Sequence, residues 1–173
     1  ILGTGPGVLK YCEAIELFIE QHQPYVIALN TQKNIRENLI DSRAACHPVR
    51  LLADCNEHMT LLQPLITPAS MLPKDVKRVL KDKELFDFGI SVNGIDFKYK
   101  DYYAELPTSL VVAYAMAIAT SGKAKNIYMA GFDGYPEGDP RNEEAEAVFR
   151  AYLSSSKCCD VSSITPTRYR IKS

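Results

Sequence analysis

The amino-acid sequence predicts an α/β fold, a three-layer Rossmann-like domain in which helices cover both faces of a mostly parallel sheet. Three observations support this prediction. Short apolar stretches recur along the chain, each is followed by a stretch of helical length with an apolar side, and turn residues separate the two. Strands that are apolar throughout are typical of a parallel sheet buried on both faces. The length of 173 residues suits a single domain.

The first half of the chain alternates regularly between the two kinds of element. Ile1-Leu2 has the character of a strand end, because a glycine-rich turn follows it directly. Pro24, Pro48, Pro68 and Pro73 lie at the borders of the next elements, where proline is tolerated. Strands are expected over residues 25–29, 43–46 and 65–67, and helices over residues 8–22, 49–59 and 74–81, with a polar helix or turn through residue 37.

The second half continues the alternation after one predicted hairpin. Asn93-Gly94 separates apolar residues 86–92 from residues 95–99, and Asn-Gly in this position predicts a two-residue hairpin turn. Pro107 is expected to open a helix over residues 108–120 that Gly122 caps. A strand at 126–130, a Glu-rich helix at 142–152 and a last strand at 161–164 complete the prediction.

Composition excludes several classes of protein. The chain has 20 basic and 21 acidic residues, so no basic excess indicates nucleic-acid binding. No apolar run approaches the roughly 18 residues that a membrane span needs. Five cysteines without regular spacing favour a reducing compartment, so we expect a cytoplasmic protein. The three histidines show no zinc-ligand spacing with the cysteines, and no metal site is expected.

The opening residues also suggest how the domain is connected. Ile1-Leu2 supplies only the end of a strand. We therefore expect further sequence before Ile1, and the single domain of residues 1–173 is interpreted as the C-terminal part of a longer chain.

A ligand site is expected where the carboxyl ends of the strands meet, because open parallel sheets bind ligands there. The residues that the prediction places at these ends are the glycine loop Gly3-Thr4-Gly5-Pro6-Gly7, then Asn30, His47, Asp133 and Tyr135, with Thr108 and Ser109 at a helix start. All of them are candidate ligand-binding residues; no catalytic residue is assigned.

The glycine loop carries the main functional hypothesis. Glycine permits positive φ and close approach of the backbone, and the following helix N-terminus attracts anions, so the loop predicts a phosphate-bearing ligand. Val8 replaces the third glycine of the dinucleotide pattern, and Asn30 stands where an NAD site has an acidic residue. NAD is therefore disfavoured. The alternative is a tight turn that binds nothing.

Each remaining candidate also has two interpretations. Asn30 can bind a base or ribose edge, or cap the next helix. His47 can bind a ligand or simply belong to a turn before Pro48. Asp133 can bind a ribose hydroxyl or a metal, or transfer a proton, or it forms a local Asx turn. Tyr135 can contact a phosphate.

These motifs resemble a Rossmann-like group that includes bacterial CMP-sialyltransferases and MptE-like pterin pyrophosphokinases. The similar segments are residues 3–7, 26–30, 45–48, 108–109 and 127–135. The resemblance implies a nucleotide pocket, in which His47 replaces an asparagine of the group. The sialyltransferases use a later histidine as general base, but no histidine follows His58 here. Sugar transfer by that mechanism is therefore not expected.

Longer stretches resemble the C-terminal domain of aldolases related to 4-hydroxy-2-oxovalerate aldolase and HMG-CoA lyase, of the kind associated with surface-polysaccharide synthesis. The stretches are residues 26–33, 45–55, 65–72, 117–125 and 164–169. This resemblance implies an N-terminal TIM barrel in the same chain, which carries the metal and the lyase chemistry. None of its catalytic residues has a counterpart in this sequence.

Three functions follow as hypotheses. The first is an accessory domain that binds a nucleotide, a nucleotide-sugar or another phosphorylated ligand and serves the fused aldolase. The second is a glycosyl- or phosphotransferase that uses Asp133 and Tyr135, with His47 as an optional further residue. The third is an assembly domain with a vestigial pocket. No cofactor is assigned beyond the nucleotide ligand, and homo-oligomer formation stays open.

Overall fold

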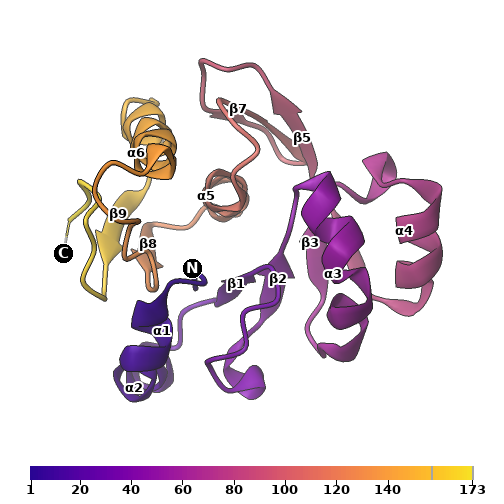
Figure 1. The fold of residues 1–173 in the computed structure, drawn as a ribbon, viewed down its shortest axis with the longest axis horizontal. Coiled ribbons are helices and arrows are strands. Elements are labelled where there is room, and N and C mark those ends of the chain that lie inside the picture. Colours follow the sequence, from indigo (N-terminus) through magenta and orange to yellow (C-terminus); the bar gives the residue numbers. More distant parts are fainter. Residues whose placement is uncertain (157, 173) are drawn as a thin grey trace.

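The computed structural model describes residues 1–156 and 158–172 and has a mixed α/β architecture with a mostly parallel sheet (Figure 1). The helices are α1 (Pro6–Lys10), α2 (Cys12–His22), α3 (Pro48–Thr60), α4 (Lys74–Val79), α5 (Val111–Ser121) and α6 (Pro140–Leu153), with short 3-10 helices at Glu37–Leu39, Ala69–Met71 and Leu80–Asp82. The strands are β1 (Ile27–Leu29), β2 (Ser42–Ala44), β3 (Leu65–Thr67), β4 (Leu85–Asp87), β5 (Gly89–Val92), β6 (Lys98–Tyr99), β7 (Tyr103–Leu106), β8 (Asn126–Met129) and β9 (Asp160–Ser163).

Leu2 joins two parallel ladders into one sheet. β1, β2, β3 and β4 pair in parallel in this order, and β8 pairs in parallel with β9. Leu2 forms parallel bridges with Ala28 at the middle of β1 and with Ala130 just after β8. The combined order is therefore β9-β8-Leu2-β1-β2-β3-β4. The chain leaves Leu2 toward β1 and later returns on the other side at β8, so the strand order reverses at Leu2.

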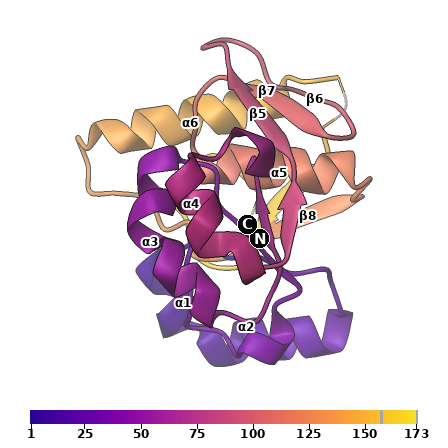
Figure 2. The same ribbon diagram turned by 90° about the vertical axis from the view of Figure 1, so that its right-hand side faces the viewer.

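Both faces of this sheet are covered, as the apolar strands predict. Alternate residues of β1 face opposite ways: Ile27 and Leu29 belong to the core around α5, and Ala28 belongs to the core around α1 and α2. A third core joins β3 to α3 and α4. Figure 1 shows α5 end-on between the sheet and an outer layer of α6, β5 and β7, while α1 and α2 lie on the opposite side of β1. The turned view shows α5 and α6 running side by side (Figure 2).

Two predicted helices differ from the structure. The helix expected over residues 8–22 is divided, because Tyr11 leaves the helical region (φ −115°, ψ 22°) between α1 and α2. The helix expected to start at Thr108 starts at Val111, after Leu110 as the N-terminal cap, and ends at the predicted cap Gly122. Among the described residues, no helix combines the length and apolar character that crossing a bilayer requires.

The predicted hairpin around Asn93-Gly94 is wrong. The Asn93 carboxamide oxygen accepts hydrogen bonds from the backbone N–H groups of Ile95 and Asp96, both at 3.0 Å, which closes a local turn. The strand after this turn does not return along β5. Instead β5 pairs in parallel with β7, and β7 pairs antiparallel with β6. The buried side chains of Ala104 and Leu106 explain the order, since β7 takes the central position that burial requires.

Candidate functional site

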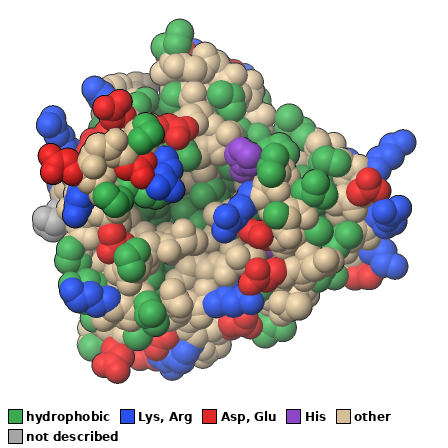
Figure 3. Space-filling model, in the orientation of Figure 1, with side chains coloured by type: hydrophobic (Ala, Val, Ile, Leu, Met, Phe, Trp, Pro, Cys, Tyr) green, Lys and Arg blue, Asp and Glu red, His purple; other side chains and the backbone are tan. Residues whose placement is uncertain are grey.

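A cavity of about 540 Å³ lies at the carboxyl ends of the strands, next to the reversal of strand order at Leu2. Five segments build it: the glycine loop, the end of β1, the first turn of α5, the stretch from β8 into α6, and the chain after β9. We call it the strand-end cavity. Its lining consists of residues 3–6, 29–30, 110–112 and 131–136 together with Arg141, Glu144, Ala145, Phe149 and Tyr169. Figure 3 shows this side of the molecule hollowed between α6 and α3, with hydrophobic side chains inside and charges of both signs around the rim.

The glycine loop packs against the segment that follows β8. The Gly3 N–H donates to the Ala130 carbonyl at 2.8 Å, and the Gly5 N–H donates to the Gly131 carbonyl at 3.0 Å. A Cβ atom on Gly5 would lie 2.2 Å from Oδ2 of Asp133 and 2.6 Å from the Gly131 oxygen. Close approach of two loops of the same chain therefore accounts for the glycines without a ligand. A Gly5→Val variant would also disturb the fold, so it is unsuitable as a test of binding.

Asp133 takes the position in which the sequence predicts a phosphate. Its Oδ2 accepts a hydrogen bond from the Gly7 N–H at 3.1 Å, across 126 positions of sequence. The partner of this carboxylate is thus the start of α1 rather than the backbone of its own turn. An anion at the same N–H group would meet a carboxylate of like charge. α1 is also only five residues long, so its terminus is a weak anion site.

The first turn of α5 offers a better position for an anion. Leu110, Val111 and Val112 line the strand-end cavity, and no side chain caps this 11-residue helix at its N-terminus. The first N–H groups of a helix have no partner within the helix, and they carry its partial positive charge. The predicted candidates just before it have other partners. The Thr108 hydroxyl donates to Glu144 at 2.6 Å, and the Ser109 carbonyl accepts from the Cys46 thiol at 3.4 Å.

Tyr169 presents a second polar group without a partner. Its side chain lines the cavity and is only 8% exposed, with its ring centroid 5.3 Å from that of Phe149. Within residues 1–156 and 158–172 its hydroxyl makes no hydrogen bond. Burial raises the pKa of this hydroxyl to about 12, so it is a neutral donor at physiological pH. The hydroxyl oxygen is not fully enclosed by the protein, so it is able to donate a hydrogen bond to a ligand atom.

Arg141 and Tyr135 form one side of the entrance. The Arg141 guanidinium carbon lies 3.9 Å from the centroid of the Tyr135 ring, a cation–π distance. Asp139 holds the guanidinium through an ion pair of 2.6 Å and raises its pKa. Asn142 accepts the Tyr135 backbone N–H at 2.8 Å, which fixes the start of this turn. The entrance therefore presents a positioned cation beside an aromatic face.

Asn30 belongs to the cavity, and His47 does not. Asn30 has a left-handed backbone (φ 51°), which asparagine tolerates, and it lines the cavity directly after β1. It caps no helix, because the next helical turn begins after Arg36. His47 is exposed and precedes Pro48 at the start of α3, where its side chain makes no capping bond. The structure agrees with the interpretation of His47 as part of a proline turn.

The structure thus brings together Gly3, Thr4, Gly5, Pro6, Asn30, Asp133 and Tyr135 around one cavity. Gly7 adjoins it through Asp133, while His47, Thr108 and Ser109 do not line it. The sequence interpretation missed Arg141, Glu144 and Tyr169. The signal for Arg141 was the Asp139-Pro140 pair, which marks the helix start that carries it; no local pattern indicated Tyr169. Comparison with protein-family models, curated proteins and solved structures finds no match.

Proposed function

We propose that this domain binds a small phosphorylated ligand, a nucleotide or nucleotide-sugar, in the strand-end cavity. One observation carries the proposal: the uncapped first turn of α5 and the unpartnered Tyr169 hydroxyl line the same cavity at the reversal of strand order. Open α/β sheets bind ligands at such a reversal.

The phosphate is assigned to the first turn of α5 rather than to the glycine loop. N–H groups at that turn are free of a capping side chain, and the Arg141 guanidinium, paired with Asp139, lies at the entrance. The start of α1 already accommodates the Asp133 carboxylate. The glycine loop then forms a wall of the cavity, held in place by its hydrogen bonds to Ala130 and Gly131.

The remaining surface suits a base and a sugar. A volume of about 540 Å³ lies within the range of small-molecule sites. Leu29, Val112 and Phe149 provide apolar surface for a flat ring, and the Asn30 carboxamide can both donate and accept at a base or ribose edge. The Tyr169 hydroxyl adds a hydrogen-bond donor that contributes to orientation.

The geometry favours binding over catalysis. Two of the residues named for the transferase hypothesis fit it poorly. His47 lies outside the cavity, and Oδ2 of Asp133 accepts the Gly7 N–H. The proposed role in service of a fused TIM-barrel aldolase rests on the sequence resemblance alone. Determining the complete parent sequence tests it, because a barrel-free parent would contradict that role.

Isothermal calorimetry with CMP, CTP and a CMP-sugar tests the binding proposal. We expect saturable binding. Tyr169→Phe keeps the ring and removes only the hydroxyl, and it should weaken CMP affinity roughly five- to tenfold, the value of about one hydrogen bond. Arg141→Met should weaken CTP more than CMP, because CTP carries more charge.

Arg150→Met is the matched control, since this exposed arginine lies on α6 but does not line the cavity. It should leave both affinities unchanged. Absence of binding by all three ligands up to millimolar concentration would contradict the proposal and favour the assembly domain. Release of CMP from the CMP-sugar with an acceptor present would favour the transferase instead.

A further inference from the structure

The chain after β9 brings Tyr169 to the strand-end cavity. We call residues 164–169 the post-β9 segment. It begins beside the end of β8, because the Ile164 N–H donates to the Met129 carbonyl at 2.9 Å. Beyond that bond the segment is neither helix nor strand, so the position of Tyr169 depends on hydrogen bonds outside any regular ladder.

Two threonine side chains of the post-β9 segment bond to the loop that follows β8. The Gly131 N–H donates to Oγ1 of Thr165 at 3.0 Å, and the Thr167 hydroxyl donates to the Phe132 carbonyl at 2.6 Å. Residues 131–133 of this loop line the strand-end cavity. The post-β9 segment is therefore attached to the back of a cavity wall.

Thr167 connects this wall to Tyr169 through a single oxygen atom. Its hydroxyl donates to the Phe132 carbonyl, and the same Oγ1 accepts the backbone N–H of Tyr169 at 3.1 Å. A hydroxyl can do both at once, because it has one donor and two acceptor sites. In the part of the chain that the structure describes, this is the only hydrogen bond of the Tyr169 N–H.

The two ends of this connection differ in how firmly they are held. The wall is bonded to the glycine loop through the carbonyls of Ala130 and Gly131. The Tyr169 ring packs on Phe149 of α6, with ring centroids 5.3 Å apart. Apolar contact has no preferred direction, whereas a hydrogen bond does. The bond through Thr167 therefore determines where the Tyr169 backbone lies and from which side its phenol enters the cavity.

We propose that Thr167 is a positioning residue for ligand binding, which holds Tyr169 so that its phenol hydroxyl is placed to bond to the ligand in the strand-end cavity. The inference rests on the proposed function, because it concerns the same cavity. Thr167 itself does not line that cavity. Loss of its hydroxyl should therefore weaken binding through Tyr169 and not through a lost contact of its own.

Calorimetry with CMP on matched variants tests this role. Thr167→Val keeps the shape of this half-buried side chain and removes both hydrogen bonds, whereas Thr167→Ser keeps the hydroxyl. We expect Thr167→Val to weaken CMP roughly fivefold and Thr167→Ser to stay within about twofold of the unsubstituted protein. Thr60→Val is the control: the exposed Thr60 hydroxyl donates to the Glu57 carbonyl at 2.8 Å, far from the cavity lining, and its loss should leave the affinity unchanged.

A double-mutant cycle shows whether the effect passes through Tyr169. The Tyr169→Phe variant has no hydroxyl left to position, so adding Thr167→Val to it should change CMP affinity by less than about twofold. An equal loss in both backgrounds would overturn the proposal. Failure of Thr167→Ser to restore the affinity, or equal affinities of Thr167→Val and Thr60→Val, would overturn it too.

The Tyr169 phenol gives a second readout that needs no ligand. Burial raises its pKa to about 12, and the phenol also feels four titratable side chains that the variants leave unchanged, Tyr135, Glu146, Asp139 and Arg141. In protein labelled at the tyrosine ζ carbons, the Tyr169 signal should stay that of a neutral phenol up to about pH 10.5. In Thr167→Val it should move toward that of the phenolate, as the pKa falls toward the ordinary 10.0 of a hydrated tyrosine. Thr167→Ser should behave like the unsubstituted protein, and Tyr169→Phe identifies the signal.

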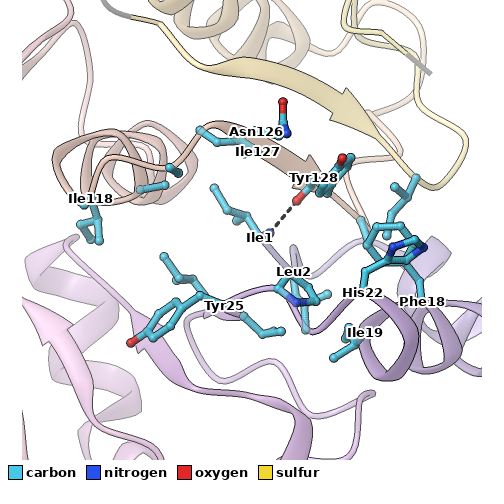
Figure 4. Close-up of a pocket in the computed structure, with 18 of the residues that line it drawn as sticks. Ile1, Leu2, Phe18, Ile19, His22, Tyr25, Ile118, Asn126, Ile127 and Tyr128 are labelled. Carbon is cyan, nitrogen blue, oxygen red and sulfur yellow. Dashed lines mark hydrogen bonds between the residues drawn. The ribbon is translucent and has the colours of Figure 1, made fainter.

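Tyr128 serves as the internal reference for this measurement. Figure 4 shows it beside Phe18 and His22 of α2; its ring centroid lies 5.3 Å from that of Phe18, and it does not line the strand-end cavity. Its signal at neutral pH should be the same in all variants. If the unsubstituted protein binds no CMP at millimolar concentration, the proposed function fails, and the Tyr169 signal still decides on Thr167. A Tyr169 signal that Thr167→Val leaves unchanged overturns the positioning role, and a shifted signal that Thr167→Ser restores supports it.

Discussion

At the scale of single residues, the glycines show where sequence interpretation succeeds and where it stops. Their presence after a strand predicted positive φ and close approach of the backbone to a ligand at residues 3–7, but the positive φ is not found at Gly3, Gly5 or Gly7. It could not tell whether a ligand or another part of the chain makes that approach. The partner is the segment from Ala130 to Asp133, more than 120 positions away in the sequence. Its position after a predicted strand made Asp133 a candidate residue. Nothing in the sequence indicated that its carboxylate accepts the Gly7 N–H.

Gly131 provides a prediction at this scale. It has φ +75°, and a Cβ atom there would lie 2.1 Å from Cγ2 of the fully buried Val8. Gly131→Ala should lower the free energy of unfolding by about 2–4 kcal/mol, from backbone strain and overpacking together. Gly138 is the control, with φ +82° and open space around the added atom. Gly138→Ala should cost only about 1 kcal/mol; equal losses in urea unfolding would contradict this account of Gly131.

Asp133 provides a second prediction. Asp133→Ala removes the acceptor for the Gly7 N–H and should destabilise the protein by about 1–2 kcal/mol. Asp133→Asn keeps an acceptor oxygen and should cost less than half as much. Urea unfolding of both variants measures the difference. If the two variants lose the same stability, the hydrogen bond to Gly7 is not what Asp133 contributes.

At the scale of elements, the apolar periodicity predicted most helices and strands to within a few residues. It failed where tertiary partners decide the outcome. Asn93 and Gly94 do form a local turn. However, β5 pairs with β7 rather than with the strand after this turn, because Ala104 and Leu106 need a central, buried position. α5 starts at Val111 and not at the predicted Thr108, because Thr108 and Ser109 make hydrogen bonds with Glu144 and Cys46, respectively. No local pattern encodes these contacts.

Tyr114 tests how α5 is anchored between the layers. It is fully buried, and its hydroxyl donates to the Phe88 carbonyl beside an edge-on ring contact with Phe88. Tyr114→Phe keeps the ring contact and leaves that carbonyl without its donor, which should cost about 1–3 kcal/mol. The control Tyr102→Phe changes a side chain that is 79% exposed, and its midpoint should not move. Thermal or urea unfolding that treats the two variants alike would contradict this anchoring role.

At the scale of the whole molecule, the sequence predicted the layers but not the order of strands. Alternating elements imply a parallel sheet, and ligands bind at the carboxyl ends of such strands. Seven of the eleven candidate residues chosen on this basis line one cavity. The reversal of strand order depends on Leu2, a single bridging residue whose two neighbours are distant in sequence. Tyr169 reaches the cavity only through the path of the chain after β9, so no local motif could indicate it.

Burial of His58 predicts a pH dependence of global stability. Burial lowers the pKa of His58 to about 4, against 6.5 in the unfolded chain. The unfolded state therefore binds more protons between pH 4 and 6.5, and stability should rise with pH across this window. Urea midpoints at several pH values measure it. His58→Leu should flatten the slope in this window, and an unchanged slope would contradict this effect of burial.

The most direct test of the central claim is an amide NMR titration of the labelled protein with CMP. If the strand-end cavity binds the phosphate at α5, the amide signals of Val111, Val112 and Ala113 should shift in a saturable way, together with that of Asn30. The Gly7 amide, bonded to Asp133, should shift much less. Shifts confined to residues outside the strand-end cavity, or no shifts up to millimolar CMP, would contradict a nucleotide site at the strand ends.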